Sequence, residues 1–222
     1  MVNRPPSRLA DPARLAALRE SALLDSAPDE AFDRLTRLVT KVLNVPVALV
    51  SLVADDHQYF KSCVGPPEMW ASGRRTALTH SFCQHVVASG EPLVVEDARL
   101  NPLVRDNLAV TDLNVIAYAG VPLFTSGGFA LGAFCAIDGK PRAWRDEEVA
   151  VLRDLAASVT AEMELLAAGR KARTDEQERA RLLAQLQRER RRVQHILRRF
   201  RAACPAATHP PPATPPRRGD SH

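Results

Sequence analysis

Long hydrophobic runs are absent from this sequence of 222 residues. The longest apolar stretch, Val45 to Ala54, is well short of the roughly 20 residues that a membrane-spanning helix needs. The opening MVNRPPSRLADPARL has no apolar segment of the kind found in secretory signals. These absences predict a cytoplasmic protein with no membrane contact.

Cysteine is scarce, and its spacing excludes several kinds of site. The chain has no CxxC motif, so c-type haem attachment is not predicted. In a chain without a signal peptide, isolated cysteines are more often buried apolar residues than disulfides. His80, Cys83 and His85 are too few for a closed zinc site, which needs four ligands, so no metal site is predicted. The cysteines are Cys63, Cys83, Cys135 and Cys204.

Two catalytic or nucleotide-binding signatures are also missing. There is no glycine-rich phosphate loop between alternating strands and helices, which argues against a parallel dinucleotide-binding sheet. No GxSxG motif occurs, so a serine hydrolase is not indicated. Paired acids such as Asp55-Asp56 are adjacent in sequence and belong to a turn, not to an acid–base pair.

The positive charge is confined to one segment. Residues 1–169 hold 16 Lys and Arg against 21 Asp and Glu, a net charge of −5. Residues 170–201 hold 12 against 4, a net charge of +8. Such a segment attracts phosphate backbones, but Phe200 is its only aromatic residue and stacking on bases needs several. Nucleic-acid binding is therefore not predicted.

The periodicity of the chain predicts helices and hairpins in a defined order. Asp11 and Pro12 start a helix, and a second carries an apolar stripe at Phe32, Leu35, Val39 and Val42. Val47–Val53 and His57–Cys63 form one hairpin and Val115–Phe124 with Phe129–Ile137 another, with Pro92–Glu96 as a further strand. A short helix starts at Thr79, and a longer one starts near Arg145.

This order predicts an α+β fold with layers: a twisted antiparallel sheet flanked by helices, followed by a long C-terminal helix. We expect a disordered N-terminus (1–10), a globular domain (11–168), a basic coiled-coil helix (169–201) after a break at Gly169, and a disordered Pro-rich tail (202–222). The coiled-coil prediction rests on positions spaced alternately by four and three residues, although several are polar; a solvated single helix is the alternative. These positions are Ala172, Glu176, Arg179, Leu183, Leu186, Arg190, Val193, Leu197 and Phe200.

Three linked motifs carry a resemblance to a known family. They read HSFCQHVVASGEPLVVEDARLNPLVRDN from His80, YAGVPLF from Tyr118, and LGAFCAIDGKPRAW from Leu131. In this order they resemble the GAF domain of bacterial sensor and signal-transduction proteins, over about residues 12–168. The resemblance implies a pocket between the sheet and the segment Thr79 to Asp112. It also implies that a binding or redox event there is passed along a helix.

Six residues are the expected lining of that pocket. An aromatic ring with a polar tip, a carboxylate and an amide are the kinds of group that orient a bound ligand. The alternative is a purely structural role, with the carboxylate capping a turn and the tyrosine packed in the sheet. The predicted ligand-binding residues are Phe82, Cys83, Asp97, Asn107, Tyr118 and Cys135.

The resulting expectation is a non-enzymatic sensory protein without an attached output domain. It binds a small molecule or senses redox state, forms a homodimer through its C-terminal helix, and signals to a protein partner; the motifs name no cofactor. The alternative is a thiol-dependent enzyme of the free methionine sulfoxide reductase type. That reading requires Cys83 and Cys135 to meet in space, one as the attacking thiolate and the other as the resolving thiol.

Overall fold

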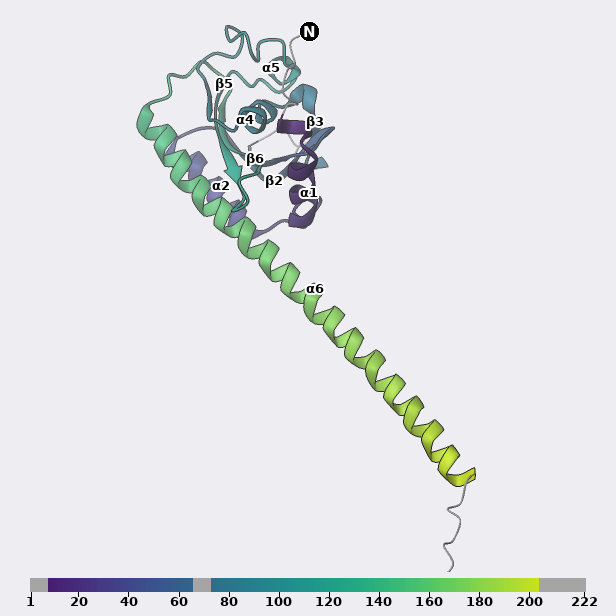
Figure 1. The fold of residues 1–222 in the computed structure, drawn as a ribbon. Helices are drawn as coiled ribbons and strands as arrows, with labels where there is room; N and C mark the ends of the chain where they lie inside the picture. The colour runs from purple at the N-terminus through teal and green to yellow at the C-terminus, as the bar shows by residue number, and fades with distance from the viewer. Residues whose placement is uncertain (1–7, 66–72, 204–222) are drawn as a thin grey trace, which may run out of the picture. The chain divides into compact units, whose positions relative to one another are not determined.

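The computed structural model describes residues 8–65 and 73–203, and the expected disorder of residues 1–7 and 204–222 lies outside that part of the chain. Arg8–Ala10, expected to be disordered, form a turn of 3-10 helix instead. The reason is a local contact: the Arg14 guanidinium donates to the backbone carbonyls of Leu9 and Val53, and so ties this turn to the sheet. Residues 202–203, expected to belong to the disordered tail, are instead the last two residues of the C-terminal helix. Two α-helices precede the first three strands, and the long C-terminal helix follows the last two strands (Figure 1). The elements are η1 (Arg8–Ala10), α1 (Pro12–Ser21), α2 (Glu30–Val42), β1 (Val47–Val53), β2 (His57–Val64), β3 (Arg75–Ala77), η2 (Leu78–His80), α4 (Cys83–Ser89), β4 (Leu93–Val95), α5 (Leu108–Asp112), β5 (Ala117–Phe124), β6 (Ala130–Asp138) and α6 (Asp146–Ala203).

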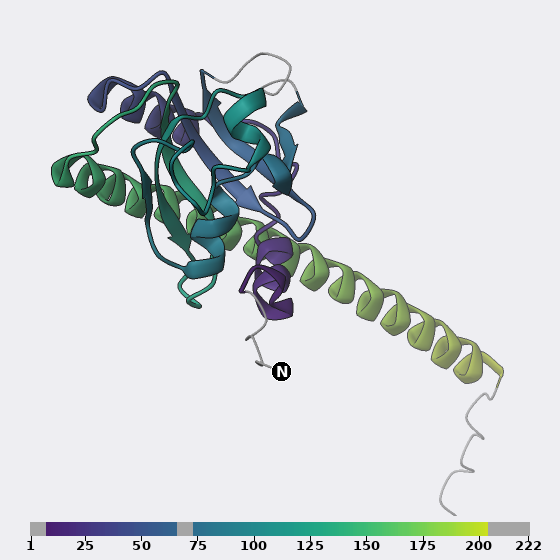
Figure 2. The same cartoon turned by 90° about the horizontal axis from the view of Figure 1, so that it is seen from above.

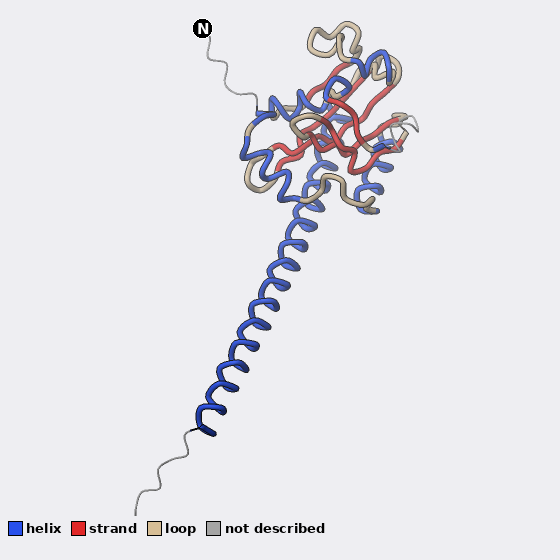
Figure 3. Tube along the Cα trace, turned by 90° about the vertical axis from the view of Figure 1, so that its right-hand side faces the viewer, coloured by secondary structure: helices blue, strands red, loops and turns tan. Residues whose placement is uncertain are grey.

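The six strands form one sheet in the order β3-β2-β1-β6-β5-β4. Every pair of neighbours is antiparallel. Figure 3 shows the strands as one twisted layer with helices on both sides. This confirms the predicted α+β fold with an antiparallel sheet flanked by helices.

Helix starts follow the capping signals of the sequence in two cases. The carboxylates of Asp11 and Asp29 accept hydrogen bonds from the backbone N–H groups two residues on, at the starts of α1 and α2. The third helix differs from the prediction, since α4 begins at Cys83 and not at Thr79. The N-cap residue is Phe82, and the hydroxyl of Ser81, one residue earlier, accepts from the backbone N–H of Gln84 in the first turn.

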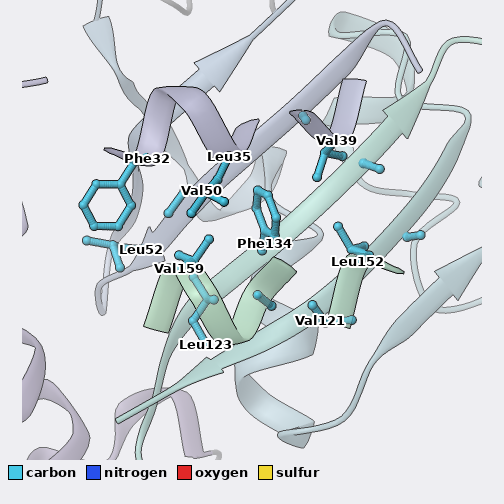
Figure 4. Close-up of a cluster of buried hydrophobic side chains, with 14 of the residues drawn as sticks. Phe32, Leu35, Val39, Val50, Leu52, Val121, Leu123, Phe134, Leu152 and Val159 are labelled. Atoms are coloured by element: carbon cyan, nitrogen blue, oxygen red, sulfur yellow. The ribbon is translucent and has the colours of Figure 1, made fainter. Parts of the chain in front are cut away.

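One face of the sheet is covered by α2 and the first part of α6, and Figure 4 shows the side chains that meet there. Phe32 and Val39 of α2 meet Val50 of β1 and Phe134 of β6 in one buried cluster with Leu152 of α6. Alternate residues of each strand point to this face, because the side chains of a strand alternate between the two faces. This is the larger hydrophobic core.

The opposite face of the sheet packs against α4 and α5 (Figure 2). Its cluster holds the remaining strand residues, among them Leu49, Tyr118 and Cys135, together with Phe82 and Val86. This second core contains four of the six predicted site residues: Phe82, Cys83, Tyr118 and Cys135.

Helix α6 runs from Asp146 to Ala203 through Gly169, so the expected break at Gly169 is absent. One glycine inside a helix costs only about 1 kcal/mol, which the neighbouring helix-forming residues offset. The chain divides into two compact units at Lys171/Ala172. In the second unit the side chains from Ala172 to Phe200 are exposed. Within the described residues, no helix is both long and apolar enough to cross a membrane.

Candidate functional site

A cavity of about 320 Å³ lies between the sheet and the segment that carries α4 and α5. Its wall comes from four strands, from both short helices and from the turns beside them. Exposed residues at one side (Gly65, Asn114 and Gly139) mark where it opens to solvent. The described lining residues are Pro46, Val47, Leu49, Gln58, Phe60, Gly65, His80, Phe82, Cys83, Ala109, Leu113, Asn114, Val115, Tyr118, Ile137 and Gly139.

Tyr118 and Cys83 meet at the inner wall of this cavity. The Tyr118 hydroxyl donates to the Cys83 sulfur at 3.4 Å, and the Phe82 ring packs at a tilt on the Tyr118 ring with 5.4 Å between centroids. The Cys135 sulfur lies 3.9 Å from the Cys83 sulfur. Cys135 is fully buried and, unlike Cys83, does not line the cavity.

Hydrogen bonding and burial shift the pKa values of Cys83, Cys135 and Tyr118 in different directions. The Cys135 thiol and the Tyr118 hydroxyl both donate toward the Cys83 sulfur, and this lowers the pKa of Cys83 although burial opposes the shift. Burial raises the pKa of Cys135 well above its ordinary value. Burial also raises the pKa of Tyr118, which keeps its hydroxyl protonated. Cys83 is therefore the more acidic of the two thiols.

The polar groups of the cavity wall are held by their own hydrogen bonds. The Gln58 amide accepts from the Ser81 hydroxyl at 2.6 Å and donates to the Thr76 hydroxyl at 2.6 Å. His80 Nε2 lies 3.0 Å from an Asp112 carboxylate oxygen, and the Thr111 hydroxyl and His80 together lower the pKa of Asp112. These hydrogen bonds fix the side chains of Gln58 and His80 in place.

The structure brings four of the six predicted site residues together. Phe82, Cys83 and Tyr118 line the cavity, and Cys135 lies directly behind Cys83. Asp97 and Asn107 lie outside the lining, which corrects the expectation that they line it.

Both residues cap turns instead. The Asp97 carboxylate accepts from the backbone N–H of Arg99 and pairs with its guanidinium at 2.6 Å, and the Arg99 guanidinium lowers the pKa of Asp97. The Asn107 amide caps α5 by accepting from the Ala109 N–H, and donates to the Ser81 carbonyl. A carboxylate or amide two residues before an N–H is the usual capping arrangement, and this was the alternative that the sequence left open.

Several lining residues were not predicted from the sequence. Gln58 and Phe60 of β2 are examples, since a glutamine in a strand usually predicts a solvated face. The pairing of β1 with β2 shifts register between Val50 and Ser51, which alters the alternation of faces that a strand pattern is read from. In the described residues there is no cluster of three or more His, Cys, Asp or Glu side chains that could hold a metal ion.

The GAF domain family model matches residues 27–163. That is more than half of the chain, and the antiparallel sheet with its flanking helices agrees with it. The protein belongs to the GAF domain family, a family of sensory domains.

One curated relative is 32% identical over 164 residues and is named Cyclic di-GMP phosphodiesterase PA2567, from Pseudomonas aeruginosa. The match covers 73% of this chain but only 27% of the relative, so the chain spans about a quarter of that protein's length. The expectation that the protein is not an enzyme is contradicted by this relative, which is named for an enzymatic activity.

Solved structures agree on the fold. The GAF domain of an Acinetobacter phosphoenolpyruvate-protein phosphotransferase is 15% identical with a TM-score of 0.51, covering 73% of this chain and 98% of that one. A free methionine-R-sulfoxide reductase from Neisseria meningitidis, solved with its substrate, is 19% identical with a TM-score of 0.51, covering 72% and 93%. At these identities the likeness concerns the fold alone.

Proposed function

We propose that this chain is a sensory module that binds a small organic molecule in the Tyr118 cavity and thereby controls a signalling enzyme. The observation that carries the proposal is the cavity itself. Its volume of about 320 Å³ falls at the lower end of the range of small-molecule sites. Its wall is mostly apolar, with Gln58, His80, Asn114 and the Tyr118 hydroxyl as the polar groups that would orient a ligand.

The lining also limits the chemistry of the ligand. Among the described lining residues there is no Asp, Glu, Lys or Arg. A phosphate or carboxylate taken out of water needs a paired charge or several donors. The expected ligand is therefore compact and uncharged, with an apolar body and one or two polar groups, and it is not a cyclic dinucleotide.

Helix α6 is the proposed route of the signal. Leu152 and Val159, near its start, are buried in the core that also holds the opposite face of β5 and β6. A change of shape at the cavity therefore reaches α6 through two shared strands.

The second unit supports a homodimer. It exposes Leu182, Leu183, Leu186, Val193, Ile196, Leu197 and Phe200 on one helix. Most of these fall on the four-and-three spacing of a coiled coil, and each of the others directly precedes such a position. A second copy of the same helix would cover this stripe.

The proposed output is control of cyclic di-GMP hydrolysis. The support is the relative named for that activity, which is 32% identical over 164 residues, or 73% of this chain. Under this proposal the GAF domain of the chain supplies the sensory input to that hydrolysis.

The alternative, a thiol reductase, is favoured by one observation, the 3.9 Å between the Cys83 and Cys135 sulfurs. Against it, free methionine sulfoxide carries an ammonium and a carboxylate, and the described lining offers neither charge a fixed counter-ion. Consumption of the sulfoxide in the presence of a dithiol would decide for the reductase.

Native mass spectrometry of the protein purified from a bacterial host tests the sensory proposal. The expected species is a dimer carrying additional organic mass. The matched variant is Ala109→Phe, which places a phenyl group in the cavity and should remove that mass while the dimer persists. A protein that binds no member of a library of uncharged aromatic and aliphatic compounds, and also purifies bare, would refute ligand binding.

A further inference from the structure

Two thiols from distant parts of the chain face each other behind the cavity. Cys83 is the first residue of α4, and Cys135 lies in the middle of β6, 52 positions later. Their sulfurs are 3.9 Å apart, whereas a disulfide bond measures about 2.05 Å. The two sulfurs must therefore approach each other by roughly 2 Å for the bond to form.

We propose that Cys83 and Cys135 form a reversible disulfide when a hydroperoxide enters the cavity, and that this bond is a second input to the same module. The role of the bond as a signal rests on the proposed sensory function. The chemistry of the pair rests only on its own geometry.

Access to the cavity assigns the two thiols different roles. Cys83 lines the cavity, so a small oxidant can reach its sulfur. Cys135 is completely buried, does not line the cavity, and has its sulfur 3.9 Å from that of Cys83. Cys83 is therefore the thiol that attacks, and Cys135 the thiol that resolves.

The reaction proceeds in two balanced steps. The Cys83 thiolate attacks the terminal oxygen of the hydroperoxide: an S–O bond forms, the O–O bond breaks, and the alcohol leaves with the proton that Cys83 gave up. The Cys135 sulfur then attacks the sulfur of the sulfenic acid: the S–S bond forms, the S–O bond breaks, and the hydroxide leaves as water with the Cys135 proton. Two thiols are oxidised by two electrons and one hydroperoxide is reduced; a dithiol reverses the bond by exchange.

Tyr118 is the positioning residue of this pair. Its hydroxyl donates to the Cys83 sulfur at 3.4 Å and stabilises the thiolate that begins the reaction. Tyr118→Phe should slow the first step on the order of tenfold, the effect of one hydrogen bond to a charged group. The pH dependence of the oxidation rate should move to higher pH as well, which a purely structural role of the ring would not cause.

The bond would alter both the cavity and the route to α6. Cys83 and Tyr118 are part of the cavity wall, so joining Cys83 to Cys135 changes its shape and removes the acceptor of the Tyr118 hydroxyl. On the other side of β6, Phe134 packs in the core that holds the start of α6. Oxidation and ligand binding therefore act on the same elements.

The other two thiols must be removed for a clean test. Cys63 lies on β2, and Cys204 lies outside the described residues. In a Cys63→Ser, Cys204→Ser background, the reduced protein is treated with hydrogen peroxide, denatured, alkylated and weighed intact. We expect a monomer-mass product that has lost two hydrogens, takes up no alkylating agent, and regains both thiols with dithiothreitol.

The single variants test the order of the steps. In this background Cys135→Ser should stop at a sulfenic acid on Cys83 that dimedone traps, while Cys83→Ser should leave Cys135 reduced. Only the protein with both thiols should show altered backbone hydrogen exchange in α4 after oxidation. Failure to form the intramolecular bond, or faster oxidation of Cys135 than of Cys83, would overturn the proposal.

Two further readouts separate this proposal from the others. Repeated turnover of methionine sulfoxide with a dithiol would overturn the switch in favour of the reductase. Binding of organic mass by the Cys135→Ser variant, whose substituted residue does not line the cavity, together with disulfide formation in the parent, supports two inputs to the same module. Disulfide formation in a protein that binds no ligand supports the Cys83–Cys135 disulfide as an input. It refutes only the proposal of ligand binding in the cavity.

Discussion

The Arg142 guanidinium donates to the Glu148 carboxylate at 2.6 Å, and so joins the segment after β6 to the first turn of α6. The same guanidinium reaches the Leu43 carbonyl at 2.6 Å and lies over the Trp144 ring, 4.8 Å from its centroid. Glu148 also accepts from the backbone N–H of Arg145 at 3.0 Å, as the acidic end of a helix cap. This partly buried ion pair fixes where α6 begins.

Because the pKa of Glu148 is lowered in the folded protein, we expect the free energy of unfolding to decrease in acid. Burial raises its pKa, but hydrogen bonds from the Arg145 backbone and the Arg142 guanidinium outweigh that effect, and the pKa falls below its ordinary value of 4.5. The folded state then binds this proton less readily than the unfolded state. The stabilisation is therefore present above about pH 4.5 and disappears as the pH falls through the lower, folded-state pKa.

Glu148→Gln should remove that part of the acid sensitivity and lower the free energy of unfolding at neutral pH. Urea unfolding on both sides of pH 4.5 measures both effects. Glu147→Gln is the matched control, since Glu147 is exposed in the same helical turn and should change neither. Parallel pH profiles for the parent and Glu148→Gln would contradict the assignment.

At two glycines of the sheet, Gly120 and Gly132, there is no free space for a methyl group, and we expect alanine substitutions there to have different effects on stability. A methyl group at Gly132 would overlap the backbone carbonyl of Ser51 on the neighbouring strand, whereas at Gly120 it would overlap only the side chain of Tyr118. Gly132→Ala should therefore destabilise the fold by about 1–3 kcal/mol.

Gly120→Ala should instead displace the Tyr118 ring from Cys83 and leave the sheet intact. We expect near-normal thermal unfolding with slower peroxide oxidation of Cys83. Equal losses of stability in the two variants would contradict this distinction.

The pKa shifts of two cysteines predict different alkylation profiles. Hydrogen bonds from Cys135 and Tyr118 lower the pKa of Cys83, and burial raises the pKa of Cys63. Because the thiolate is the reactive form, iodoacetamide should modify Cys83 of the native, reduced protein at a lower pH than Cys63. Peptide mapping of a Cys204→Ser variant resolves the two sites. Modification of both at the same pH would mean that the Tyr118 and Cys135 contacts do not favour the thiolate.

Much of the fold follows from patterns that act over short distances. Phe32, Leu35 and Val39 form a helical stripe in the sequence and are buried together. Asp11 caps α1 as the sequence predicts, and Asp29 caps α2 in the same way. These features depend only on spacing and on residues two to four positions apart.

The site was predicted less completely, because it depends on contacts between distant residues. The motifs identified Phe82, Cys83 and Tyr118, but capping and ligand binding use the same carboxylate and amide groups. Local sequence could not separate the two roles for Asp97 and Asn107. The contact of Cys83 with Cys135 depends on where α4 crosses the sheet. From the sequence, this contact could be stated only as a requirement of the reductase alternative.

The exposed stripe of the second unit predicts how the chain associates. If two copies of α6 pair through Leu183 and Leu186, aspartates at both positions would bury two unpaired charges in each copy and abolish the dimer. Ala184→Asp is the matched control, since it adds a charge at an exposed position between them and off the four-and-three spacing. Light scattering coupled to size exclusion should report a monomer for the Leu183→Asp, Leu186→Asp variant and a dimer for the control. Circular dichroism should show a folded sheet domain in both. A dimer that survives the double substitution would place the association on the GAF domain itself and remove the coiled coil from the proposed signal route.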